Sequence, residues 1–178
     1  MKTTNFYSLS LVALLLLGFN SCKKELLVNF DTQLSETKSL RINQTSGSSV
    51  PFKEVLTIEL ENSDTEEYLD RISSIENINN FTYQFKNFIG DPTGTISMNT
   101  LVNGVTIDRI ENIVVKTEVE NEKKFQITDP EKLNAISSAL TQDLKVTFEF
   151  SGTAQCDAAP MGFDIELKMN VDVVANAL

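Results

Sequence analysis

The carboxylates are the side chains in this sequence best suited to chemistry. The chain has 25 Asp and Glu residues, and the stretch NSDTEEYLD at 62–70 contains four of them. Carboxylate oxygens are good calcium ligands, but this stretch lacks the glycine and the ligand spacing of an EF-hand loop. Acidic residues also stabilise the first turn of a helix. We therefore interpret 62–70 as the start of a helix and expect no metal site.

The residue types needed for catalysis are sparse. Two carboxylates can hydrolyse a glycosidic bond when a fold brings them together, and spacing in the sequence does not show whether that happens here. The chain has no His to act as a general base and no Trp to stack against a sugar. Its serines occur in no nucleophile elbow and in no S-x-x-K motif, and no Gly-rich phosphate loop is present. We expect neither an enzyme nor a cofactor.

A cysteine follows a short apolar segment near the N-terminus. Lys2 precedes an apolar run of eleven residues at 9–19, and Cys22 lies three residues beyond it. Such a helix would cover about 16 Å, against about 30 Å of bilayer hydrocarbon. The run is therefore too short to span a bilayer and has the length of a signal-peptide core. Phe19 is too large for the small-residue cleavage site of ordinary secretion.

The pair Ser21-Cys22 resembles the lipobox of bacterial lipoproteins, in which a small residue precedes a cysteine that is acylated and becomes the new N-terminus. The resemblance covers residues 1 to about 25, and Phe19 and Asn20 stand where Leu and Ala or Ser are usual. The motif Ser-Cys followed by two lysines is similar to the stretch around the acylated cysteine in lipoproteins of the Bacteroidota. The alternative is an ordinary signal peptide that ends in a chance cysteine.

The resemblance implies a signal peptide at 1–21 and a lipidated anchor and short tether at 22–25. The remaining residues, 26–178, are enough for a single β-rich globular domain. The resemblance also implies attachment to the outer membrane, since Lys23 is not the Asp that retains lipoproteins in the inner membrane. Whether the domain lies on the periplasmic face or at the cell surface stays open. Cys156 would then have no partner, and we interpret it as an inert thiol.

The charge balance narrows the choice of partners. The formal net charge is −10, and removal of the segment containing Lys2 leaves 14 basic against 25 acidic side chains, or −11. A chain this acidic is repelled by phosphate backbones. We therefore expect no nucleic-acid binding.

Period-two alternation of apolar and polar residues predicts half-buried antiparallel strands at 56–60, 81–85, 146–150 and 163–175. Turn-forming residues divide these runs at 43–51, 90–94, 102–105 and 151–162. Among them, Asn103-Gly104 is the strongest hairpin signal. The last strand is the longest, and we expect it to be central or a long edge strand. If residues 26–42 do not pair in a sheet, they would instead extend the tether.

Two helices are predicted between the strands. Ser63 and Glu66 have the spacing of a capping box, followed by an apolar stripe at Tyr68, Leu69, Ile72 and Ile75. Thr128 and Glu131 have the same spacing, with Asp129-Pro130 between them and an apolar stripe at Leu133, Ile136 and Leu140. The predicted fold is mainly β, an antiparallel β-sandwich with two short peripheral helices.

The resulting hypothesis is a lipid-anchored envelope protein with a non-catalytic binding or scaffold domain. Its partners would be the membrane, through acylated Cys22, and another envelope protein. Two alternatives remain open. The aromatic residues Phe81, Tyr83, Phe85 and Phe88 would line a groove in a carrier of apolar ligands, although aromatics at strand spacing usually form a core. A hydrolase would need a carboxylate site that the sequence does not reveal.

Overall fold

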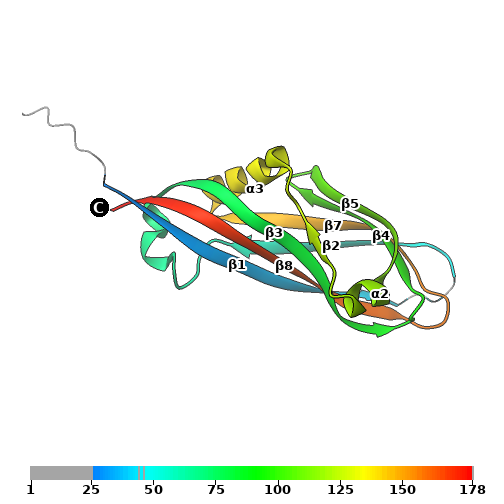
Figure 1. The fold of residues 1–178 in the computed structure, drawn as a ribbon. Coiled ribbons are helices and arrows are strands. Elements are labelled where there is room, and N and C mark those ends of the chain that lie inside the picture. Colours follow the sequence, from blue (N-terminus) through cyan, green and yellow to red (C-terminus); the bar gives the residue numbers. More distant parts are fainter. Residues whose placement is uncertain (1–25, 44, 46, 178) are drawn as a thin grey trace, which may run out of the picture.

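Two antiparallel sheets of four strands form a β-sandwich in the computed structural model, which describes residues 26–43, 45 and 47–177 (Figure 1). In order across the first sheet, here called sheet A, lie β1 (Leu27–Ile42), β8 (Met161–Asn176), β3 (Ile72–Gly90) and β6 (Lys124–Gln126). Sheet B contains β2 (Val50–Glu59), β7 (Lys145–Gln155), β4 (Thr95–Val102) and β5 (Val105–Val114). The predicted β-sandwich is confirmed.

Strand β8 is the centre of sheet A and pairs with β1 and β3. Its alternating residues face the space between the sheets and are almost fully buried: Phe163, Ile165, Leu167, Met169 and Val171. Aromatic side chains fill the same space, and the rings of Phe81 and Phe148 stack with their centroids 5.3 Å apart. Burial of these side chains is the main source of stability, at roughly 25 cal/mol per Å² of apolar surface.

The strand β1 pairs with β8 along its whole length, from Leu27 opposite Asn176 to Ile42 opposite Met161. The alternative in which residues 26–42 form a tether therefore does not match the structure. The predicted loop at 151–162 is also shorter than expected, because β7 continues to Gln155 and β8 begins at Met161.

In the part of the chain that the structure describes, three short helices accompany the sheets, one more than predicted there. They are a 3₁₀ helix η1 (Glu66–Arg71), α2 (Val115–Glu120) and α3 (Pro130–Asp143), and α3 packs against β3 and β7. Neither capping box forms. The residue before η1 is Thr65, which makes no side-chain cap. Helix α3 is capped by Asp129, whose carboxylate accepts a hydrogen bond from the N–H of Glu131 at 3.0 Å.

Strand β3 explains why the first helix was predicted too long. Its first half has an apolar residue at every third position, and Ile75, Ile78 and Phe81 are buried. That spacing is close to a helical period and therefore predicts a helix that includes Ile72 and Ile75. The strand instead contains repeated β-bulges, with register shifts against β8 between Ile75 and Asn77 and between Asn79 and Thr82. Each extra residue places two consecutive polar residues on the outer face.

The hairpin between β4 and β5 forms as predicted. Asn103 and Gly104 both have positive φ, 51° and 79°, which is the geometry of a type I′ turn. No side chain approaches the position that a Cβ on Gly104 would occupy. The backbone conformation, and not lack of space, is therefore what favours glycine there.

Candidate functional site

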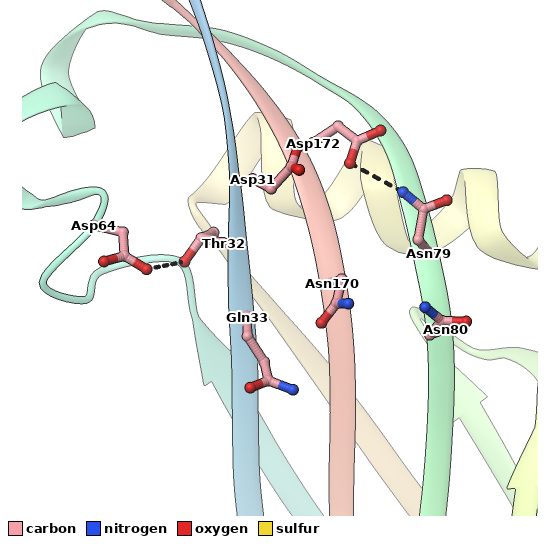
Figure 2. Close-up of a pocket in the computed structure, with 8 residues that line it drawn as sticks. All are labelled: Asp31, Thr32, Gln33, Asp64, Asn79, Asn80, Asn170 and Asp172. Carbon is pink, nitrogen blue, oxygen red and sulfur yellow. Dashed lines mark hydrogen bonds between the residues drawn. The ribbon is translucent and has the colours of Figure 1, made fainter.

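A polar hollow of about 640 Å³ lies on the outer face of sheet A (Figure 2). Strands β1, β8 and β3 form its floor, and the turn before η1 forms one side. Eight residues line it, and none of them is basic or apolar: Asp31, Thr32, Gln33, Asp64, Asn79, Asn80, Asn170 and Asp172. The hollow thus combines three carboxylates with four carboxamides and one hydroxyl group.

Two carboxylates of this hollow lie directly opposite each other. Asp31 of β1 and Asp172 of β8 are Cα partners in the antiparallel register. Like charges in this arrangement repel and destabilise the strand pair. Asp172 is held by two amide donors, the Nδ2 groups of Asn77 and Asn79, each at 3.0 Å. Among residues 26–43, 45 and 47–177, no hydrogen bond or ion pair to the Asp31 carboxylate is found, so its oxygens are free to accept hydrogen bonds from a ligand.

The third carboxylate, Asp64, is positioned by a hydrogen-bonded turn. The hydroxyl of Thr32 donates to Asp64 at 3.1 Å, and the amide of Asn62 donates to Thr32 at 2.8 Å. The buried hydroxyl of Thr65 closes the turn by donating to the carbonyl of Leu60. These contacts set part of the acidic stretch 62–70 beside β1, where the sequence predicted the first turn of a helix.

The amides on the opposite side of the hollow depend on a bulge in β3. Asn80 has a φ of 54°, in the left-handed region that asparagine tolerates better than most residues. As a result the side chains of Asn79 and Asn80 are both exposed, although the two residues are neighbours in a strand and lie between the buried Ile78 and Phe81. The signal in the sequence is the pair of polar residues between apolar ones at 78 and 81, which the helical interpretation of this region obscured.

The lining of the hollow offers carboxylate and amide oxygens to a ligand. Within the described ranges, no three or more His, Cys, Asp and Glu side chains are close enough together to hold a metal ion. The three carboxylates of the hollow are hydrogen-bond acceptors and suit a ligand with several donor groups.

The aromatic stripe of the sequence belongs to the core. The ring of Tyr83 stacks on Phe125 with centroids 4.8 Å apart, and its hydroxyl donates to Asp108 at 2.6 Å. Burial is the main cause that raises the pKa of Tyr83. Phe85 packs edge-on against Phe163, with a centroid distance of 5.2 Å. Because these rings fill the space between the sheets, the packing does not favour a carrier of apolar ligands.

Of the two cysteines, Cys156 lies within the described residues and Cys22 does not. The thiol of Cys156 is buried, at 1% exposure. Its pKa is raised, first by burial and then by the carboxylates of Asp91 and Asp157. A thiol that is buried and kept protonated is a poor nucleophile, in line with the inert role predicted for it. Cys22, the predicted lipidation site, lies outside the described residues, as does the predicted signal peptide.

No protein-family model matches this chain, and no curated protein matches it either. Among the described residues, no helix has both the length and the apolar character needed to cross a membrane.

Proposed function

We propose that this protein is a lipid-anchored protein of the bacterial outer membrane whose β-sandwich is a non-catalytic binding domain. The outer face of sheet A binds a basic segment of another envelope protein. The observation that carries this proposal is the polar hollow, where Asp31 opposes Asp172 in the strand register and no basic residue is present to neutralise them.

The chemistry of the lining selects the ligand. An anion would meet three carboxylates, and an apolar group would displace water from carboxylates and amides without replacing their hydrogen bonds. Ammonium and guanidinium groups are donors only and match these acceptors. A basic segment approaching Asp31 and Asp172 would also relieve the repulsion between them.

The expected affinity is modest and fits a partner held in the same membrane. Exposed ion pairs each contribute about 0.2–1 kcal/mol. Two or three such pairs give weak binding in solution. Anchoring both proteins to one membrane would raise their effective concentration and make weak contacts sufficient.

The anchor follows from the lipobox resemblance. One acyl chain holds a protein only marginally, whereas a diacylglycerol and an amide-linked chain on Cys22 would give stable attachment. Strand β1 begins at Leu27, so four residues join it to the anchor. They span about 13 Å when extended, which would hold this end of the sandwich near the bilayer.

A defined peptide probe tests the binding face. The soluble domain is titrated with a short peptide rich in Lys and Arg and with its Glu-rich counterpart. We expect binding of the basic peptide alone, weakening as salt is added. Asp31→Asn with Asp172→Asn should reduce the affinity about tenfold. A photo-crosslinker in place of Gln33 would then identify the partner in native envelopes.

The matched control removes two acidic side chains from sheet B, with Glu59→Gln and Glu149→Gln. It changes the net charge equally, so any loss of binding due to overall charge would appear in both double variants. Equal losses, or equal binding of the two peptides, would contradict the proposed site.

A further inference from the structure

A second hollow lies further along the outer face of sheet A and has the opposite charge character. It encloses about 450 Å³ between strands β8, β3 and β6 and the end of helix α2. Its charged lining consists of three lysines and two glutamates, Lys86, Lys124, Lys168, Glu122 and Glu166, and its other side chains are uncharged. Its formal charge is thus +1 within a chain of −10.

Two of the lysines are held in place by one carboxylate. The ammonium groups of Lys86 and Lys168 lie 2.7 and 3.1 Å from the two oxygens of Glu166. Glu166 is largely buried, with 18% of its side chain exposed. Each ammonium group has three N–H donors, so each keeps donors for a ligand after pairing with Glu166. The pairing also restricts both lysine side chains before any ligand arrives.

The strand register adds the third lysine to the same row. Gln84 of β3 is the Cα partner of both Glu166 of β8 and Lys124 of β6. Within the ranges that the structure describes, Lys124 is found in no ion pair. A ligand at this row would therefore meet one ammonium group outside any ion pair, beside two that share a single carboxylate, with the Gln84 amide between them. Glu122 also lines the hollow.

We propose that this second hollow is an oxoanion site that binds the phosphate, sulfate or carboxylate group of a soluble ligand. Oxoanions accept several hydrogen bonds at once and suit converging ammonium and amide donors. The first hollow has no basic residue and cannot serve this purpose, so one sheet face would carry two sites of opposite preference.

The fold indicates that the anion does not come from the anchoring membrane. Glu166 pairs with Thr37 of β1, ten residues beyond Leu27. At about 3.3 Å per residue, the row lies about 33 Å from the start of β1, toward the end of the sandwich that carries α2 (Figure 1). Salt screens electrostatic interactions with lipid headgroups beyond about 10 Å. The inference that the anion comes from a soluble ligand rests on the proposed anchor at Cys22, whereas the oxoanion site itself does not.

Inorganic phosphate is the probe for the test, with chloride at the same ionic strength as the reference. Amide and side-chain NMR signals of the domain are followed during the titration. We expect saturable shifts around Lys86, Lys124 and Lys168. Lys124→Gln should weaken phosphate binding about three- to tenfold, because it removes an ammonium group that is in no ion pair.

Lys53→Gln is the control for the loss of one positive charge elsewhere, since Lys53 lies on sheet B, where it pairs with Glu149 at 2.7 Å. Its phosphate affinity should equal that of the parent. No saturable shift in the second hollow, or an equal loss in Lys53→Gln and Lys124→Gln, would overturn the oxoanion site. Vesicles of equal parts phosphatidylcholine and phosphatidylglycerol form a second arm. If they bind the domain and Lys124→Gln abolishes this, the soluble source is overturned.

Discussion

The carboxylate of Asp91 accepts a hydrogen bond from the backbone N–H of Asp157 at 2.7 Å and thereby joins two loops at one end of the sandwich. The same carboxylate accepts from the N–H of Ala158 at 2.9 Å, and from the N–H and hydroxyl of Thr93 at 2.9 and 2.7 Å. Asp91 is 1% exposed. It connects the turn after β3 with the loop between β7 and β8.

These bonds make stability depend on pH. They hold the pKa of Asp91 well below its usual range, with the Ala158 N–H as the main cause. A lowered folded-state pKa gives a contribution that is complete above the unfolded pKa, about 3.9, and is lost as pH falls through the folded pKa. As the pH is lowered below about 4, we expect the midpoint of thermal unfolding of the parent to decrease more steeply than that of Asp91→Asn. Circular dichroism measures both.

Thr93→Val is the control for that series. It removes one hydrogen bond to Asp91 and leaves the carboxylate and its two backbone donors in the 157–158 loop. At neutral pH, Thr93→Val should lower the unfolding midpoint, relative to the parent, by less than Asp91→Asn does. The same acid dependence in Asp91→Asn as in the parent would assign the acid sensitivity to other carboxylates, such as Asp164, whose pKa is lowered mainly by the Ser39 hydroxyl.

The stability of the domain should come mainly from the packed sheets. Phe148 is fully buried and stacks on Phe81 across the sandwich. Phe148→Ala should therefore cost about 3–5 kcal/mol of unfolding free energy. Ser63 contacts only its neighbour Asp64 and caps no helix, so Ser63→Ala should cost less than about 0.5 kcal/mol. Urea denaturation measures both, and the reverse order would contradict the assigned core.

The open edge of β1 should be protected against pairing with a second copy. Glu36 and Lys38 are opposite the buried Leu167 and Ile165, so both lie on the core side of an edge strand. Lys38 reaches Glu54 of β2 at 3.1 Å and links the two sheets. Inward charges of this kind block edge-to-edge association. Glu36→Val with Lys38→Val should increase self-association in analytical ultracentrifugation, whereas Ser35→Val with Thr37→Val, on the other face, should increase it less.

Hydrogen exchange should separate the sandwich from its tether. Strand β1 is an edge strand that pairs only with β8 in sheet A, so alternate amides of 27–42 should exchange slowly and the others quickly. Amides preceding residue 26 should exchange quickly in the mature protein if that stretch is the proposed tether. Fast exchange at every amide of 27–42 would mean that β1 does not pair stably with β8.

Lipidation at Cys22 is tested by phase partition. The parent, expressed with its leader in a bacterium that acylates lipoproteins, should enter the detergent phase, since two or three acyl chains bind membranes stably. Cys22→Ala should remain in the aqueous phase. Cys156→Ala is the matched control, and it should partition as the parent does. Equal partition of the parent and Cys22→Ala would refute the anchor.

The local patterns of the sequence determined the main strands and the tight hairpin. Alternation over 163–175 predicts β8 because the two-residue period is a property of an extended backbone, whatever it pairs with. Asn103-Gly104 predicts its turn because both residues tolerate positive φ. Where two structures share nearly the same period, the pattern failed: apolar residues three apart at 72, 75 and 78 fit a helix as well as a bulged strand.

Only the tertiary structure decided the two candidate sites. Asp31 meets Asp172, and Glu166 lies in one row with Lys124, through pairing register between strands that are distant in the chain. Register is set by the summed packing of whole strands, and a shift of one residue would turn each of these side chains to the other face. No local stretch of sequence contains that information, so the separation of acidic and basic hollows on one sheet face becomes visible only in the folded chain.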